Sequence, residues 1–288
     1  MVRHVIGEAV KETGDASAIE EVRGVSGGEI NEAFLVTTGQ QRYFVKINRE
    51  TAADFFEWEA RGLELLRSTK TVAVPEVYFY GEKDGVAALV LEWVEGQPNE
   101  RTEETLGRDV ARMHRTYGQA FGLDYDNYIG TFEQLNGWHE DWIVLLRDKR
   151  LAVQAELAER KGRMNAKRRS RMENILEGLD RWVPGDVKPS PLHGDLWGGN
   201  WIVGSGGRPY LIDPAVFYGH FEFELAFTEL FGGYSARFYD AYREMLPIPP
   251  EYEERRPLYQ LYYLLVHLNE FGEAYGGSVD RVLRKYGG

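Results

Sequence analysis

The fold of this chain is decided by the stretch Pro191-Leu192-His193-Gly194-Asp195-Leu196-Trp197-Gly198-Gly199-Asn200-Trp201-Ile202-Val203, together with Leu211-Ile212-Asp213-Pro214. Two short apolar segments, 201–203 and 210–212, flank a glycine-rich turn at 204–207, a pattern that predicts a small hairpin. Because a hairpin returns the chain to the end at which it began, the residues on either side are expected to lie close together.

Three polar residues stand on the two sides of this hairpin: Asp195, Asn200 and Asp213. An Asn and an Asp that directly follows a strand offer the oxygen ligands that hold magnesium against the phosphates of a nucleotide. A further Asp just before them can accept the proton of an attacking hydroxyl group. The pattern therefore predicts phosphoryl transfer.

The length and composition indicate a globular protein with a substantial core. The chain has 288 residues, of which 43% are hydrophobic and 28% charged. This length favours two subdomains around a cleft rather than two independent domains.

The net charge of −12 argues against nucleic acid as a partner, because phosphate backbones are bound by basic surfaces. A single nucleotide needs only a few local cations, metal ions and backbone N–H groups, which an acidic protein can supply in one cleft.

No cysteine is present, so disulfides, thiol nucleophiles and sulfur metal ligands are excluded. The first residues lack the apolar segment of a signal peptide, and no apolar run approaches the ~20 residues that span a bilayer. We predict a cytoplasmic protein without a membrane segment, and the sequence leaves its oligomeric state open.

The N-terminal third predicts a five-stranded antiparallel sheet with one main helix. A short amphipathic helix is expected over residues 2–12, and the main helix over 52–68. The strands are expected at 19–25, 31–38, 42–47, 77–80 and 86–94. We assign residues 1–94 to an N-lobe.

Two features of this lobe could contact a nucleotide. Gly27 and Gly28 lie between the first two strands, where missing side chains would let backbone N–H groups approach a triphosphate, although an ordinary hairpin turn looks the same. Lys46 lies in an apolar strand and could contact phosphate, or it could simply be an exposed lysine. Spacing alone allows Glu57, Glu59 or Glu64 of the following helix as its ion-pair partner.

The remaining residues, 95–288, are predicted to form a mostly helical C-lobe that carries the catalytic loop, the metal site and the acceptor site. Residues 92–98 break the strand pattern and fit a hinge whose backbone could hydrogen-bond adenine. The aromatic region 121–142 indicates packing. Residues 147–171 indicate a helix pair whose basic side chains form a solvated face, and 222–286 indicate further core helices.

The residues from His193 through Asn200, with Asp213, resemble the protein-kinase-like small-molecule kinases related to aminoglycoside phosphotransferases and choline kinases. A wider set of motifs is similar to the fructosamine kinase (ketosamine 3-kinase) family, and it extends from about residue 20 to the C-terminus. These motifs are 27–31, 43–46, 59–63, 127–130, 192–200, 213–220, 228–233 and 267–269. The resemblance implies an α+β chain with the bilobal protein-kinase-like fold.

The resemblance also implies roles for individual residues. Asp195 would be the catalytic base, and Asn200 and Asp213 would hold Mg²⁺. The residues implied to bind ATP are Gly27, Gly28, Lys46, Glu59, and, through their backbone, Glu92 and Val94. Trp197 would form an apolar wall for the acceptor.

Three departures from the family pattern stand out. Gly198 lies where a serine is usual, and the segment Phe221-Glu222-Phe223-Glu224 lies where a basic residue is expected. Glu224 replaces an Asp that would brace the catalytic loop through its backbone, so the longer side chain leaves that brace to be tested. Since there is no cysteine, thiol control of the glycine loop is excluded.

The reaction implied by the resemblance is ATP-dependent phosphorylation of the 3-hydroxyl group of a ketosamine, which makes the sugar adduct unstable and promotes deglycation. The acceptor would be a fructosamine or ribulosamine on a protein or a small amine. One alternative is a kinase of the aminoglycoside or choline type that acts on another hydroxyl group. A binding-only pseudoenzyme is a second alternative, but it predicts loss of catalytic residues, and all of them are present.

Overall fold

The computed structural model describes residues 2–25, 31–49 and 55–288. Packing divides the chain into two compact units, which are described separately. Unit 1 comprises Met1–Leu106 and Asn200–Pro214, and unit 2 comprises Gly107–Gly199 and Ala215–Gly288. These units are defined by packing and divide the chain differently from the predicted lobes. The lobe boundary after residue 94 stays a prediction.

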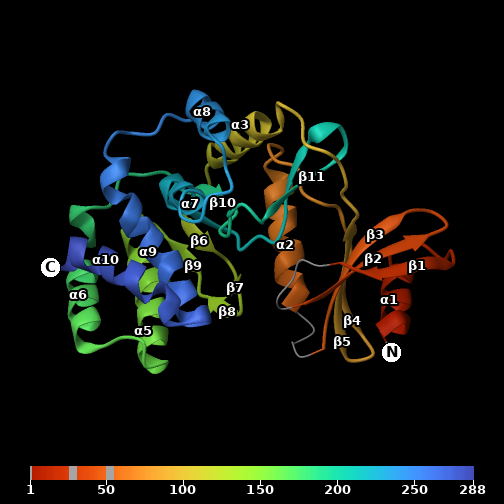
Figure 1. Ribbon diagram of the computed structural model, residues 1–288, viewed down its shortest axis with the longest axis horizontal. Helices are drawn as coiled ribbons and strands as arrows, with labels where there is room; N and C mark the ends of the chain where they lie inside the picture. Colours follow the sequence, from red (N-terminus) through yellow and green to blue (C-terminus); the bar gives the residue numbers. More distant parts are fainter. Residues whose placement is uncertain (1, 26–30, 50–54) are drawn as a thin grey trace. The chain divides into compact units, whose positions relative to one another are not determined.

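Unit 1 is built on a five-stranded antiparallel sheet with strand order β1-β2-β3-β5-β4. The strands are β1 (Ile19–Gly24), β2 (Glu32–Thr38), β3 (Arg42–Asn48), β4 (Val77–Lys83) and β5 (Val86–Glu92). Two helices accompany the sheet, α1 (Val2–Lys11) and α2 (Phe55–Ser68). Figure 1 shows the sheet with α1 against it. The predicted sheet and its main helix are confirmed.

Helix α1 covers one face of this sheet. Its buried residues Val5, Ile6, Ala9 and Val10 recur at helical spacing and pack against alternate residues of β3 and β5, among them Val45 and Ile47. Full burial of each Val or Ile side chain contributes about 1.5–3 kcal/mol. Because side chains alternate along a strand, the residue between Val45 and Ile47 points to the opposite face of the sheet.

The hairpin of β11 (Trp201–Val203) and β12 (Pro209–Leu211) belongs to unit 1, and it closely matches the predicted hairpin. Its turn packs against the linker after β5: a Cβ atom on Gly96 would lie 1.9 Å from the Gly204 carbonyl oxygen. The side chains of Asn99 and Thr102 donate to the carbonyls of Gly206 and Gly207, each at 2.8 Å. The linker therefore anchors the hairpin within unit 1.

Helix α3 (Thr102–His114) begins in unit 1 and ends in unit 2, the helical unit. Unit 2 contains α4 (Trp142–Leu145), the π-helix η1 (Leu146–Leu151), α5 (Ala152–Arg160), α6 (Ala166–Glu177), the 3-10 helix η2 (Leu179–Arg181), α7 (Phe221–Thr228), α8 (Ala236–Met245), α9 (Tyr252–Phe271), the 3-10 helix η4 (Glu273–Tyr275) and α10 (Gly276–Gly287). The predicted helical C-terminal part is confirmed.

Short strands also occur in unit 2. A four-stranded sheet has the order β10-β13-β6-β9, and a separate hairpin pairs β7 with β8. The strands are β6 (Phe121–Leu123), β7 (Asn127–Ile129), β8 (Phe132–Gln134), β9 (Gly137–His139), β10 (Ser190–Leu192) and β13 (Phe217–Gly219). Three-residue strands are too short to show alternation, so the aromatic region 121–142 gave no strand signal.

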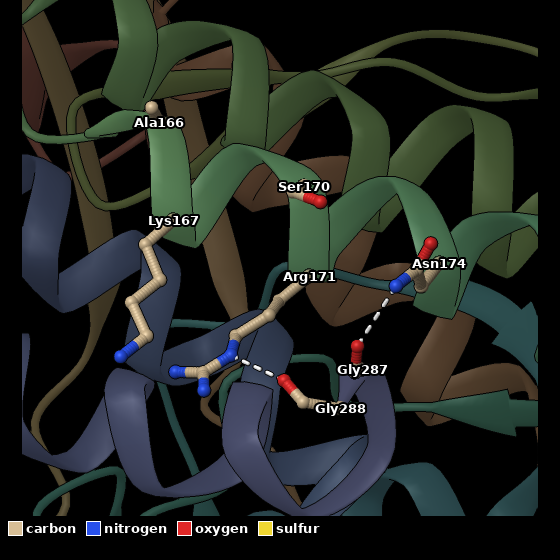
Figure 2. Close-up of a pocket in the computed structure, with 7 residues that line it drawn as sticks. All are labelled: Ala166, Lys167, Ser170, Arg171, Asn174, Gly287 and Gly288. Carbon is tan, nitrogen blue, oxygen red and sulfur yellow. Dashed lines mark hydrogen bonds between the residues drawn. The ribbon is translucent and has the colours of Figure 1, made fainter.

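The interpretation of the basic segment on α6 as a solvated face is wrong for Arg168. Its guanidinium is buried and donates to Glu273 at 2.8 and 2.9 Å and to Asp280 at 2.8 and 3.2 Å. Farther along α6, Arg171 and Asn174 donate to the carbonyls of the last two residues, at 2.5 and 2.9 Å (Figure 2). These polar contacts join α6 to α10 and to the segment before it.

None of the helices in the described ranges combines the length and the apolar composition that crossing a membrane would require.

Candidate active site

Lys46 lies at the centre of a charged cluster in unit 1. It is on β3, between two residues that face α1, so its side chain extends from the opposite face of the sheet. Its Nζ donates to Glu59 Oε1 on α2 at 2.9 Å and also to Asp213 Oδ1. Of the three glutamates that spacing allowed, Glu59 is therefore the one that pairs with Lys46.

The two carboxylates of this cluster share one cation, and the pKa values of Lys46 and Glu59 reflect this. Burial opposes the charge of Lys46, but the charges of Asp213 and Glu59 outweigh that effect and raise its pKa above the ordinary range. Burial, helped by the charge of Asp213 and opposed by that of Lys46, raises the pKa of Glu59 to about 7. The cluster carries excess negative charge, which a cation placed near Asp213 would compensate.

Asn200 and Asp213 lie at the same end of the β11–β12 hairpin. The Asn200 carbonyl accepts from the Ile212 N–H at 3.0 Å, directly beyond the paired residues Trp201 and Leu211. Asp213 has a positive φ of 54°, a conformation that Asp adopts more readily than most residues. An amide oxygen and a carboxylate are hard oxygen donors of the kind that Mg²⁺ takes alongside phosphate and water, so this donor set fits magnesium.

The residues predicted to meet the nucleotide base lie where β5 ends. The Glu92 N–H donates to the Glu76 carbonyl at 2.8 Å, so this N–H is already engaged within unit 1. Val94 lies in the linker and packs near Gly204 of the hairpin turn. Gly27 and Gly28 lie outside the described residues.

The loop predicted to be catalytic, residues 193–199 of unit 2, follows β10 and carries Asp195. It is called the catalytic loop below. Gly194 has a φ of 84°, and a Cβ atom there would lie 1.9 Å from the Ala215 carbonyl oxygen, so only glycine fits. The Gly194 carbonyl accepts from the Tyr263 hydroxyl at 2.9 Å, and the His193 carbonyl accepts from the Ala215 N–H at 2.8 Å. The backbone before Asp195 is therefore fixed on both sides.

Glu224 on α7 braces this loop, which the sequence left open. Its Oε1 accepts from the Gly194 N–H at 2.6 Å, and its Oε2 accepts from the His193 N–H at 3.1 Å. Burial opposes the charge, but hydrogen bonds from His114 and Gly194 lower the pKa of Glu224 below its ordinary value. The longer side chain thus holds two successive backbone N–H groups as a carboxylate.

Sequence reasoning missed His114, which holds Glu224, and Tyr242, which holds His114. His114, at the end of α3, places Nε2 at 2.8 Å from Glu224 Oε2 and Nδ1 at 2.7 Å from the Tyr242 hydroxyl. All three side chains are buried. His114 continues the buried spacing of Leu106 and Val110 on α3, and a histidine on an apolar helix face was the only local signal.

Glu222 lies two residues earlier on α7 and is buried. The Arg255 Nη2 atom donates to the Glu222 Oε1 atom at 2.6 Å. Glu222, in the segment where a basic residue was expected, thus has its cation on α9.

The segment after Asp213-Pro214 is fixed inside unit 2 by the β7–β8 hairpin. The Gln134 side chain donates to the Ala215 carbonyl at 3.0 Å, and the Asn127 side chain donates to the Val216 carbonyl at 2.8 Å. Asn127 belongs to a motif that matched the family pattern, and this contact gives it a structural role.

Trp197 is 44% exposed, so it is not a core residue. Its ring lies over Gly199, because a Cβ atom there would be 2.2 Å from the indole. The Trp197 carbonyl accepts from the Tyr234 hydroxyl at 3.2 Å. The backbone is therefore held while the ring remains accessible.

Gly198 departs from the usual serine for a steric reason. A Cβ atom on Gly198 would lie 2.8 Å from the Gly233 Cα atom and 3.2 Å from the Gly232 carbonyl oxygen. Gly233 has a φ of 98°, and a Cβ atom on it would lie 2.7 Å from the Gly198 Cα atom. The catalytic loop and the loop after α7 touch here through backbone alone, so a serine would force them apart.

The comparison that decides the family covers almost the whole chain: the sequence model of the fructosamine kinase family matches residues 1–286. The chain belongs to the fructosamine kinase family. Within this family, a probable ketoamine kinase of Lactiplantibacillus plantarum is 41% identical over 271 residues, which are 93% of this chain and 95% of the relative. The chloroplastic protein-ribulosamine 3-kinase of Arabidopsis thaliana is 34% identical over 287 residues, 98% of this chain and 87% of the relative.

Solved structures agree with the fructosamine kinase assignment. A crystal structure from Haemophilus somnus, assigned as a fructosamine-3-kinase, matches with a TM-score of 0.88 and 28% identity over 99% of this chain and 97% of the other. An aminoglycoside phosphotransferase matches with a TM-score of 0.63 at 18% identity over 100% of both chains, which shows the shared fold alone. The predicted family and protein-kinase-like fold are confirmed, and the enzyme class is that of an ATP-dependent kinase acting on a hydroxyl group.

Proposed function

We propose that this fructosamine kinase transfers the γ-phosphoryl group of ATP to the 3-hydroxyl group of a ketosamine, with Mg²⁺ as cofactor. The names of relatives that are 34–41% identical over most of the chain, ketoamine kinase and protein-ribulosamine 3-kinase, support this acceptor. The observation that carries the proposal is the catalytic loop, in which Glu224 and Tyr263 fix the backbone that presents Asp195.

Asp195 is proposed to accept the proton of the acceptor hydroxyl as that oxygen bonds to the γ-phosphorus and the bond to the ADP oxygen breaks. A fixed loop backbone suits this step, because catalysis here depends on positioning a hydroxyl group rather than on covalent chemistry with the protein. Trp197, exposed two residues after the base, is proposed to form the apolar wall against which the acceptor lies.

Residues of unit 1 are proposed to hold the nucleotide. Asn200 and Asp213 would bind Mg²⁺, which when present neutralises charge on the phosphates. Lys46, which Glu59 orients in this structure, would then contact the phosphates. The backbone of Glu92 and Val94 is proposed to meet adenine.

Gly27 and Gly28 are proposed to cover the phosphates. The cytoplasmic location of the protein also stays a prediction.

The experiment that tests the function is an ATP-consumption assay on fructose and ribulose adducts of small amines, with an aminoglycoside and choline as competing acceptor classes. We expect turnover on the ketosamines, with phosphate on the 3-oxygen as located by phosphorus NMR. The Asp195→Asn variant is the matched control and should lose turnover while binding ATP normally. Turnover confined to the aminoglycoside or choline would refute the ketosamine assignment.

A further inference from the structure

A row of aromatic side chains on α9 leads away from the catalytic loop. Tyr263, His267 and Phe271 recur every four residues, so they share one face of the helix. Tyr263 donates to the Gly194 carbonyl at 2.9 Å, and Phe271 lies eight residues farther, about 12 Å along the helix axis. This face of α9 therefore runs outward from the loop that carries Asp195.

The outer part of this row is an exposed aromatic patch, which we define as Phe231, Phe271 and Tyr275 around His267. The His267 ring centroid lies 4.6 Å from that of Phe231, 5.0 Å from that of Tyr275 and 5.6 Å from that of Phe271. Phe231 is 41% and Phe271 53% exposed. Large aromatic rings that gather at the surface beside a catalytic loop are typical of a binding site.

The motifs that contain Phe231 and His267 matched the family pattern, yet the phosphoryl-transfer mechanism assigns no step to the patch. Phe231 directly precedes Gly232 and Gly233, which touch Gly198 of the catalytic loop. The patch is thus connected to the loop from two directions, through α9 and through the segment after α7.

The charged groups at the outer end of α9 have both signs. The Glu270 carboxylate accepts from the Thr131 hydroxyl at 2.7 Å, whereas Lys161 and Arg163 donate to backbone carbonyls of α9. Burial lowers the pKa of His267, so the ring at the centre of the patch is neutral. The rings offer an apolar surface, which suits the carbon stem of an alkyl chain.

We propose that the aromatic patch binds the alkyl substituent on the nitrogen of the ketosamine acceptor. This inference rests on the proposed function. In a ketosamine the nitrogen is bonded to C1, two carbons from the C3 that bears the reacting hydroxyl group, and it is a secondary amine that is protonated at neutral pH. With the hydroxyl group at Asp195, the substituent extends along the α9 row to the exposed rings. The patch thus selects acceptors carrying an alkyl chain, such as the lysine stem of a glycated protein.

The test compares two acceptors that differ only in this substituent, the fructose adducts of methylamine and of Nα-acetyl-lysine. Steady-state kcat and KM are measured for both on the wild type, on Phe271→Ala and on Phe271→Leu. The matched control is Trp138→Ala, which removes an aromatic ring that is 51% exposed elsewhere in unit 2. The oligomeric state of each variant is measured in parallel by analytical ultracentrifugation.

We expect Phe271→Ala to raise KM for the lysine adduct about tenfold and to leave KM for the methylamine adduct within about twofold of the wild type. Phe271→Leu should give a smaller rise, because it keeps apolar area but loses the ring face. Trp138→Ala should change neither acceptor.

Equal changes on both acceptors, no change on either, or a change of oligomeric state in Phe271→Ala would overturn the inference while leaving the proposed function intact. A wild type that phosphorylates neither adduct would instead refute the proposed function, and the inference with it.

Discussion

Replacing Glu224 by Gln tests whether the brace on the catalytic loop supports turnover. The carboxylate receives three hydrogen bonds, from the Gly194 N–H at 2.6 Å, the His193 N–H at 3.1 Å and His114 at 2.8 Å. An amide offers one oxygen in place of two, so its NH₂ group must face at least one of these buried donors. Loss of a charge-assisted bond, at about 1.5–3 kcal/mol, and one unsatisfied buried N–H, at about 1–3 kcal/mol, together predict destabilisation of about 2.5–6 kcal/mol.

The same change should displace the backbone that presents Asp195, and a misplacement of ~1 Å can lower a rate by about a hundredfold. We therefore expect kcat on a ketosamine to fall by about ten- to a hundredfold. KM for ATP should change little, because the residues proposed to bind ATP lie in unit 1. Urea unfolding followed by tryptophan fluorescence measures the stability, and initial rates measure kcat and KM.

Glu222→Gln is the matched control for this prediction. Glu222 is equally buried on the same helix, but it pairs with Arg255 and makes no contact with the loop backbone. It should lower the free energy of unfolding while leaving kcat within about twofold. A Glu224→Gln variant that keeps wild-type kcat, or a Glu222→Gln variant that loses kcat equally, would refute the positioning role of Glu224.

Three further predictions concern the residues proposed to handle nucleotide and acceptor. Trp197→Ala should raise KM for a ketosamine and cost less than about 1 kcal/mol of stability, because the ring is 44% exposed; a large loss of Tm would contradict its role as an acceptor wall. Asp213→Ala should abolish the magnesium dependence of ATP binding in calorimetry, and wild-type protein that binds ATP equally with and without the metal would disprove the site. The pKa of Glu59 is about 7 in the folded, nucleotide-free protein and 4.5 in the unfolded chain. Between pH 4.5 and 7 the folded state therefore binds more protons than the unfolded state, and its stability falls as the pH rises through this window. Thermal melts from pH 5 to 8 should show this slope in the wild type and a weaker one in Glu59→Gln; parallel slopes would exclude the assignment.

The hairpin and its polar residues could be predicted because their signals are local. The apolar segments, the glycine turn and the positions of Asn200 and Asp213 all lie within a short stretch, and a hairpin brings its own ends together. The partner of Lys46 was harder, since three glutamates of one helix satisfied the spacing. The family resemblance selected Glu59, and the fold shows that it faces Lys46.

The brace on the catalytic loop could not be predicted in the same way. It joins residues from α3, α7 and α8, and no local pattern indicates that His114 contacts both Glu224 and Tyr242 in the core. Arg168 shows a related limit: its neighbours in sequence are charged and exposed, whereas its carboxylate partners lie about a hundred residues later in the chain. Long-range contacts decide burial at such positions, and composition alone favours a solvated face.

The assignment of the β11–β12 hairpin to unit 1 has an evolutionary consequence. The residues proposed to bind metal and nucleotide are packed with the sheet, whereas Asp195, Trp197 and the aromatic patch are packed with the helices of unit 2. Substitutions that alter the acceptor can therefore accumulate in one unit without disturbing the packing around Lys46 in the other. Such a division lets one architecture diversify its acceptor by changes to unit 2 alone.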